Sequence, residues 1–118
     1  MKILVVDDET LIREVIKEYA SLENYLVKEA SNGYEAIEMV KKEDFDLIIM
    51  DIMMPKLDGY SASREIKKIK DIPIIMLSAR GEELDKLNGF DLGIDDYITK
   101  PFSPKELIAR IKAVSKRN

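Results

Sequence analysis

The 118-residue sequence contains no cysteine and no histidine. The absence of cysteine excludes disulfides and thiolate chemistry, and it is consistent with a reducing cytosol. The absence of histidine excludes a Ser-His-Asp triad, a histidine general base and the usual zinc sites. Any acid, base or nucleophile must therefore be an aspartate, glutamate, lysine, serine, threonine or tyrosine.

Long apolar runs are missing as well. No run approaches the roughly 20 residues that a membrane-spanning helix needs, and Met1-Lys2 leads directly into a strand pattern, so no signal peptide is visible. We therefore expect a cytoplasmic protein with no membrane partner. With 46% hydrophobic and 36% charged residues, the composition is that of one globular domain over residues 1–118.

The net charge of −4 argues against non-specific nucleic-acid binding by the whole chain. Positive charge is nevertheless concentrated in residues 103–118, which contain five basic residues and one acidic residue. Two interpretations of this basic end remain open. It is either a solvated helix face whose cations lie near the negative end of the helix dipole, or a surface that binds a partner.

Short apolar runs alternate with segments of helical periodicity. The apolar runs predict strands that are buried on both faces of a parallel sheet, and the alternation predicts an α/β doubly wound fold with five strands and five helices. The predicted strands are Ile3–Val6, Tyr25–Ala30, Asp46–Asp51, Ile74–Leu77 and Tyr97–Thr99. The predicted helices are Thr10–Ala20, a segment around Ala36–Val40, Tyr60–Ile69, Glu82–Leu92 and a last helix that opens with the capping-box pattern Ser103–Glu106.

Two of these helices carry more specific expectations. The first helix is predicted to have one buried face, and Glu82–Leu92 is predicted to be the least stable helix because its apolar residues are few and Gly89 interrupts it. The apolar residues of the first helix are Leu11, Ile12, Val15, Ile16 and Tyr19.

Polar side chains follow four of the strands at their carboxyl ends. Asp7 and Asp8 follow the first strand, Asp51 ends the third, Ser78 follows the fourth and Lys100 the fifth. The carboxyl ends of parallel strands lie at one edge of a sheet, where ligands bind. Carboxylates that repel one another persist there when a cation lies between them, and oxygen ligands without histidine or cysteine suit Mg²⁺. A metal, a lysine, a hydroxyl and a free carboxylate can together handle a phosphoryl group.

Four motifs in this order carry a family resemblance. Together they make the chain similar to a receiver domain of two-component response regulators over essentially all 118 residues. The motifs are Val5–Glu9, then Asp51 with Met53–Pro55 and Asp58–Gly59, then Leu77–Ala79, then Tyr97–Phe102.

The resemblance implies a flavodoxin-like strand order 2-1-3-4-5 and a phosphoacceptor at Asp51. It also implies a role for each further site residue, and a cis peptide bond between Lys100 and Pro101. The resemblance implies that Mg²⁺ is held by Asp7, Asp8, Asp51 and the Met53 carbonyl. It also implies that Lys100 pairs with the phosphoryl group. Ser78 and Tyr97 are the implied switch pair.

Ser78–Glu82 and Asp95–Lys112 are similar to the subgroup that carries a winged-helix DNA-binding domain. The resemblance implies a sensor histidine kinase as partner, DNA binding only through a C-terminal effector domain, and a homodimer formed by helix 4, strand 5 and helix 5. The effector domain is absent from these 118 residues, so the chain is expected to be a stand-alone receiver or, in view of its end at Ser115–Asn118, part of a longer regulator. The implied cross-subunit pairs are Lys86 with Glu106, Asp96 with Arg110, and Asp95 with Lys112.

Plainer interpretations exist for each site residue. The aspartates can cap helices or form turns, Lys100 can be a solvated loop residue, Ser78 a turn residue and Tyr97 a half-buried strand residue. Two other functions also remain open: an aspartyl phosphatase or phosphotransferase, and an interaction module that takes no phosphate. The first is disfavoured because Met53 occupies the position where such enzymes usually have a second aspartate as general acid. The second is disfavoured by the complete set of site residues.

Overall fold

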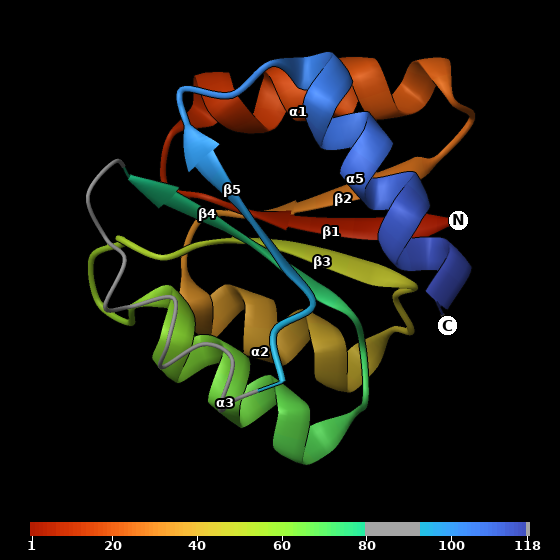
Figure 1. Cartoon of the computed structure of the whole chain (residues 1–118). Coiled ribbons are helices and arrows are strands. Elements are labelled where there is room, and N and C mark those ends of the chain that lie inside the picture. The colour runs from red at the N-terminus through yellow and green to blue at the C-terminus, as the bar shows by residue number, and fades with distance from the viewer. Residues whose placement is uncertain (80–92, 118) are drawn as a thin grey trace.

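The computed structural model describes residues 1–79 and 93–117. Five parallel strands form one sheet in the order β2-β1-β3-β4-β5, with helices on both of its faces (Figure 1). The predicted fold class and strand order are therefore confirmed. The strands are β1 (Lys2–Val6), β2 (Leu26–Ala30), β3 (Leu47–Asp51), β4 (Ile74–Ala79) and β5 (Asp96–Lys100). The helices in the described part are α1 (Thr10–Leu22), α2 (Gly33–Lys42), α3 (Gly59–Ile69) and α5 (Pro104–Arg117).

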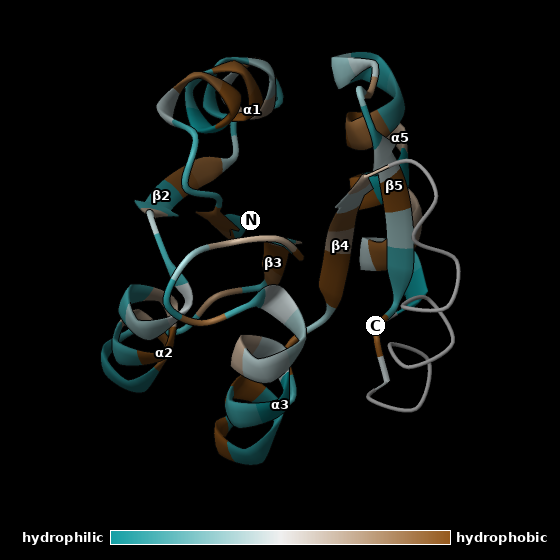
Figure 2. Cartoon of the chain, turned by 90° about the vertical axis from the view of Figure 1, so that its left-hand side faces the viewer, coloured by the Kyte–Doolittle hydropathy of each residue, from teal (hydrophilic) through white to brown (hydrophobic). Residues whose placement is uncertain are grey.

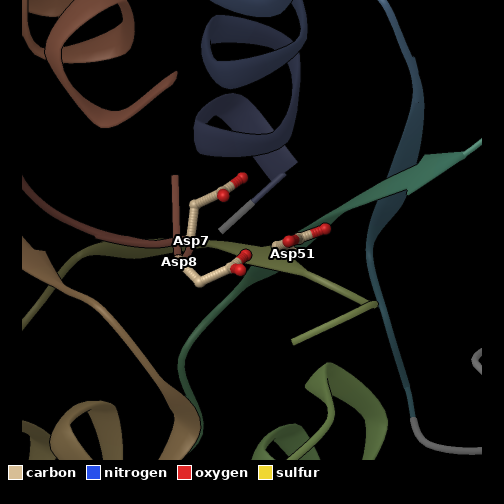
Figure 3. Close-up of side chains that lie close together, drawn as sticks. All are labelled: Asp7, Asp8 and Asp51. Atoms are coloured by element: carbon tan, nitrogen blue, oxygen red, sulfur yellow. The ribbon is translucent and has the colours of Figure 1, made fainter. Parts of the chain in front are cut away.

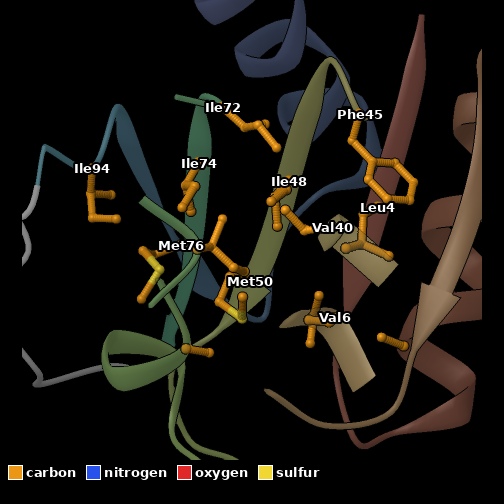
Figure 4. Packing of buried hydrophobic residues seen from close by; sticks show 14 of the residues in the cluster. Leu4, Val6, Val40, Phe45, Ile48, Met50, Ile72, Ile74, Met76 and Ile94 are labelled. Carbon is orange, nitrogen blue, oxygen red and sulfur yellow. The ribbon is translucent and has the colours of Figure 1, made fainter. Parts of the chain in front are cut away.

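Alternation along the strands divides the core into two halves. In β1, Leu4 and Val6 face α2 and α3, whereas Ile3 and Val5 face α1 and α5. The other central strands repeat this division, and Figure 4 shows the half that packs on α2 and α3. Because every residue of β3 is buried, each large side chain there contributes about 2 kcal/mol through its removal from water.

The result is a three-layer arrangement. The pair α1 and α5 lies on one side of the sheet, and the pair α2 and α3 lies on the other (Figure 1). In Figure 2, which looks at the carboxyl ends of the strands, brown apolar surfaces of the helices face the sheet and teal polar surfaces face outward. All five strands are parallel, so residues that follow them collect at this one edge.

The helices α1 and α5 differ from the sequence-based prediction. The helix α1 extends to Leu22, and the side chain of Leu11 is 70% exposed, so its predicted place on the buried face is wrong. The capping box of α5 is half formed. The Ser103 hydroxyl accepts from the Glu106 amide at 3.4 Å, but the Glu106 carboxylate accepts from Arg110 instead of closing the box. The predicted helix Glu82–Leu92 lies outside the described residues.

The β3–α3 connection folds back onto the end of β3. The Gly59 amide donates to the Ile52 carbonyl at 2.8 Å, and the Asp58 side chain caps α3 by accepting from the Ser61 amide at 2.9 Å. A Cβ atom on Gly59 would lie 2.2 Å from the Asp51 carbonyl oxygen and 2.8 Å from the Ile52 Cα. Glycine is therefore required at residue 59 by close backbone contact.

No helix in the described ranges is long and apolar enough to cross a membrane.

We expect Gly59→Ala to lower the free energy of unfolding by about 2–3 kcal/mol, because the new methyl group must push the end of β3 away. Gly93 offers a matched control. It has a φ of +77° and nothing within 4 Å of an added Cβ, so Gly93→Ala should cost about 1 kcal/mol of left-handed strain alone. Urea unfolding followed by circular dichroism measures both values. Equal losses in the two variants would contradict the steric role of Gly59.

Candidate functional site

The carboxyl ends of β1 and β3 bring three aspartates together. The two strands are neighbours, and Val6 at the end of β1 lies opposite Met50 in β3. One carboxylate oxygen from each of Asp7, Asp8 and Asp51 lies within 4.8 Å of the others, and Figure 3 shows the three side chains gathered at this edge. Asp7 and Asp51 are buried, whereas Asp8 is exposed. The three carboxylates that follow the strands in the sequence thus form one cluster.

Lys100 at the end of β5 reaches into this cluster. Its Nζ lies 2.9 Å from Asp7 Oδ2 and 3.2 Å from Asp51 Oδ1. Side chains alternate between the two faces of the sheet along each strand. By this alternation, Asp51 in β3 and Lys100 in β5 both lie on the face covered by α1 and α5. The lysine therefore supplies a positive charge between two buried carboxylates. The Lys100–Pro101 peptide bond is cis, as the resemblance implied.

Burial and repulsion make Asp51 unusually reluctant to ionise. Burial, followed by the nearby negative charge of Asp7, raises the pKa of Asp51 to about 6, although Lys100 acts in the opposite direction. For Lys100, burial by itself would lower the pKa, but its hydrogen bonds and attraction to Asp7 and Asp51 outweigh burial and raise it. At neutral pH, Asp51 is therefore an ionised carboxylate in a setting that favours the approach of more positive charge.

The two predicted switch residues lie in neighbouring strands. Ser78 is fully buried in β4, one residue beyond the position that pairs with Asp51. Its Oγ has no hydrogen-bond partner within residues 1–79 and 93–117, and a buried hydroxyl without a partner carries a free-energy cost. Tyr97 in β5 is 8% exposed and belongs to the core half on α2 and α3, so it is more buried than the plain strand interpretation expected. The Ser78 hydroxyl is thus available to a new acceptor.

Met53 lies in the loop after β3, two residues beyond Asp51, and its side chain points outward. Met53 is 66% exposed, and the loop is fixed by the bond between the Gly59 amide and the Ile52 carbonyl. The role of the Met53 carbonyl as a metal ligand stays a prediction.

The donor set fits a hard divalent cation. The cluster offers oxygen ligands from three carboxylates, two of them buried, while Lys100 supplies one of the positive charges that they need. Mg²⁺ prefers such oxygen sets and keeps several waters, so one or two direct carboxylate ligands suffice for it. Asp7, Asp8 and Asp51 are the side chains that could hold it.

The family model of the response regulator receiver domain matches residues 3–112. The chain belongs to this family. It is 51% identical over 116 residues to the transcriptional regulatory protein ResD of Bacillus subtilis. This match covers 98% of this chain and 48% of ResD. It is 53% identical over 116 residues to the probable transcriptional regulator ycf27 of Guillardia theta. This match covers 98% of this chain and 46% of ycf27.

Solved receiver structures agree with this assignment. The receiver domain of the Francisella response regulator 1452 superposes with a TM-score of 0.90 at 38% identity and covers 98% of this chain and 97% of that one. This receiver domain spans about half the length of the curated relatives it matches.

Charged residues on β5 and α5 pair within the receiver domain. The Arg110 guanidinium donates to both carboxylate oxygens of Asp96, at 3.0 and 3.1 Å, and lies 3.2 Å from Glu106. Lys112 pairs with Glu23 at 2.6 Å. The Asp95 carboxylate accepts from the Ile74 amide at 2.9 Å. The implied partners across a dimer are therefore occupied inside one subunit, and Lys86 lies outside the described residues.

An apolar groove adjoins Lys100 on the α1 side of the receiver domain. It has a volume of about 380 Å³, and the exposed Leu11 lies in its wall. Helical periodicity cannot distinguish such a surface from a core-facing stripe, which explains the wrong expectation for Leu11. The lining residues are Leu11, Ile12, Val15, Lys100, Pro101, Phe102 and Pro104.

One residue near the site was missed by sequence reasoning. Arg13 in α1 donates to the Asp7 carbonyl oxygen at 2.6 Å. The signal in the sequence is weak, because a long cation on a helix is ordinarily a solvated residue.

The raised pKa of Asp51 predicts a pH dependence of stability without divalent metal. The folded domain keeps the Asp51 proton up to about pH 6, whereas the unfolded chain loses it near pH 4. Between these values the folded state binds more protons, so the free energy of unfolding falls as pH rises. Asp51→Asn should abolish this fall and be more stable than wild type by about 2–3 kcal/mol at pH 8, with no gain below pH 4.

Urea titrations in EDTA at pH 4, 6 and 8 measure this difference. A matched control is Asp71→Asn, because Asp71 is fully exposed. A gain for Asp51→Asn that does not change with pH would show that the carboxylate charge is not its source.

Proposed function

We propose that this receiver domain is a phosphorylation-controlled switch in which Asp51 accepts a phosphoryl group from a sensor histidine kinase or a small phosphodonor. The observation that carries the proposal is the buried carboxylate of Asp51, with Asp7 and Asp8 within 4.8 Å and Lys100 at 3.2 Å. A plain helix cap or turn residue would be neither buried against a second carboxylate nor paired with a lysine from another strand.

The chemistry follows from the charges. An oxygen of ionised Asp51 attacks phosphorus, the bond from phosphorus to the donor breaks, and the donor leaves with the electron pair. When bound by Asp7, Asp8 and Asp51, Mg²⁺ supplies positive charge for the phosphoryl oxygens. Lys100 already lies beside Asp51 and neutralises a further oxygen. The product is an acyl phosphate on Asp51.

The conformational response begins at Ser78. Its buried hydroxyl without a partner gains an acceptor when a phosphoryl oxygen arrives. The movement of Ser78 and of Tyr97 in the neighbouring strand shifts an existing equilibrium toward an active surface around β5, α5 and the helix that the sequence predicts at Glu82–Leu92. The supporting observation comes from the β4–β5 ladder: Ser78 lies opposite Thr99, and Met76, two residues before Ser78 in β4, lies opposite Tyr97.

The output is proposed from the relatives. ResD and ycf27 are named as transcriptional regulators, and this domain corresponds to about half of each. We propose that it works in the cytoplasm as the regulatory part of such a protein, with DNA contacted through an effector domain. The groove beside Lys100 is a surface on which a donor protein can lie next to Asp51.

Catalytic turnover of external substrates is not part of this proposal. Met53, two residues after Asp51, cannot act as a general acid, so the acyl phosphate lasts longer than it would in a phosphatase. Steady-state hydrolysis of a phosphomonoester by the purified domain would overturn this conclusion.

We expect a small phosphodonor such as acetyl phosphate to label wild type with Mg²⁺ present and to leave Asp51→Asn unlabelled, because the nucleophile is then absent. The label should be labile in acid and in alkali, as an acyl phosphate is, and should not form in EDTA. Intact-mass spectrometry measures it as a single added phosphoryl group.

Asp71→Asn serves as the control, since Asp71 is exposed and outside the cluster. It should label as wild type does. Labelling of Asp51→Asn to the wild-type level would remove Asp51 as the phosphoacceptor.

A phosphorylated homodimer is the second expectation. The Arg110–Asp96 ion pair is only partly buried, and ion pairs at the surface are worth only about 0–1 kcal/mol, so Arg110 can exchange its Asp96 partner for the Asp96 of a second subunit at little cost. With beryllofluoride and Mg²⁺, wild type should sediment as a dimer and Arg110→Ala as a monomer, whereas Lys116→Ala on the exposed last turn of α5 should still dimerise. Analytical ultracentrifugation measures the fraction of dimer. Equal dimerisation of Arg110→Ala and Lys116→Ala would contradict an interface that includes Arg110.

A further inference from the structure

Asp8 has less support than the other two members of the carboxylate cluster. Asp7 and Asp51 are buried and contact Lys100, whereas Asp8 is exposed. In the part of the chain that the structure describes, no side chain donates a hydrogen bond to the Asp8 carboxylate or forms an ion pair with it. The position of that carboxylate is therefore set by the backbone that carries it.

Three hydrogen bonds fix this backbone. The Asp7 amide donates to the Ala30 carbonyl at 3.2 Å, and the Glu9 amide donates to Asp7 Oδ1 at 2.9 Å. The third bond runs from Arg13 Nη1 to the Asp7 carbonyl oxygen at 2.6 Å. This carbonyl belongs to the peptide unit between Asp7 and Asp8, so its direction decides where the Asp8 Cα and carboxylate lie.

Arg13 is itself held in place. Its Nε donates to Glu29 Oε1 in β2 at 3.1 Å, and Nη2 approaches Thr10 Oγ1 at 3.4 Å. The side chain is 14% exposed. A planar guanidinium that is anchored at Nε presents Nη1 in a fixed direction, which a lysine ammonium cannot reproduce.

We propose that Arg13 is a positioning residue for the divalent cation: by holding the Asp7–Asp8 peptide unit, it orients the Asp8 carboxylate toward the ion. This inference rests on the proposed Mg²⁺ site. Groups that orient metal ligands in this way typically change metal affinity about 10–100-fold when they are removed.

Geometry and charge predict opposite results for Arg13, which makes the inference testable. If Arg13 acted only as a cation near the cluster, its removal would make the site more negative and tighten Mg²⁺ binding. If Arg13 orients Asp8, its removal weakens binding. Arg13→Lys separates the two effects further, because it keeps the charge and loses the guanidinium geometry.

The experiment is calorimetric titration of the whole 118-residue chain with Mg²⁺ alone, for wild type, Arg13→Met, Arg13→Lys and the control Arg64→Met. Arg64 is exposed on α3, which covers the opposite face of the sheet from α1. We expect Arg13→Met to weaken Mg²⁺ binding about tenfold, Arg13→Lys to weaken it by a similar factor, and Arg64→Met to leave it unchanged.

Two further measurements separate positioning from general stability. Amide hydrogen exchange at Asp8 and Glu9, measured in EDTA, should be faster in Arg13→Met than in wild type, whereas exchange in the centre of β3 should be unchanged. Faster exchange throughout the sheet would indicate a merely structural role and overturn the inference.

Unchanged or tighter Mg²⁺ binding by Arg13→Met would also overturn the positioning role of Arg13. The proposed phosphoacceptor function would remain intact. Failure of wild type to bind Mg²⁺ at all would instead remove the proposed metal site, and with it the role of Arg13.

Discussion

The repulsion between the buried carboxylates of Asp7 and Asp51 is the constraint around which this receiver domain is arranged. Two negative charges removed from water at one sheet edge are costly, and Lys100, in contact with both, offsets part of that cost. Burial, together with the remaining negative charge, raises the pKa of Asp51, and that negative charge makes a divalent cation a favourable addition. The same imbalance supports the proposed acceptance of a phosphoryl group, which requires positive charge around it.

The sheet makes this imbalance possible because its central strand β3 is fully buried. Apolar residues pack on both faces of β1 and β3 and stabilise the pair of strands that carries Asp7 and Asp51. The lysine comes from β5, two strands away from β3 in the sheet, and its contact with Asp7 links residues 93 positions apart in the sequence. Local chain segments could not hold such a cluster together; the tertiary fold provides the free energy that keeps the like charges adjacent.

Much of this arrangement could be predicted from sequence. The apolar runs marked the strands, and the polar residues directly after them marked Asp7, Asp8, Asp51 and Lys100, because parallel strands leave few other places for such residues to go. Leu11 was misplaced because helical periodicity is the same for a core face and for an exposed groove. Arg13 was missed because the group that links it to the site is the backbone carbonyl of Asp7, and no side-chain pattern reveals such a bond. The half-formed capping box has a similar cause: Glu106 has a competing partner, Arg110, one turn further along α5.

The close approach of Gly59 to the end of β3 has a mechanical consequence. Side chains between packed elements normally absorb small displacements by changing rotamer, and here none is present, since the first turn of α3 lies directly on the Asp51 and Ile52 backbone. The end of β3 and the start of α3 are therefore joined by direct backbone contact, and a change at the Asp51 backbone is transmitted to α3 through that contact.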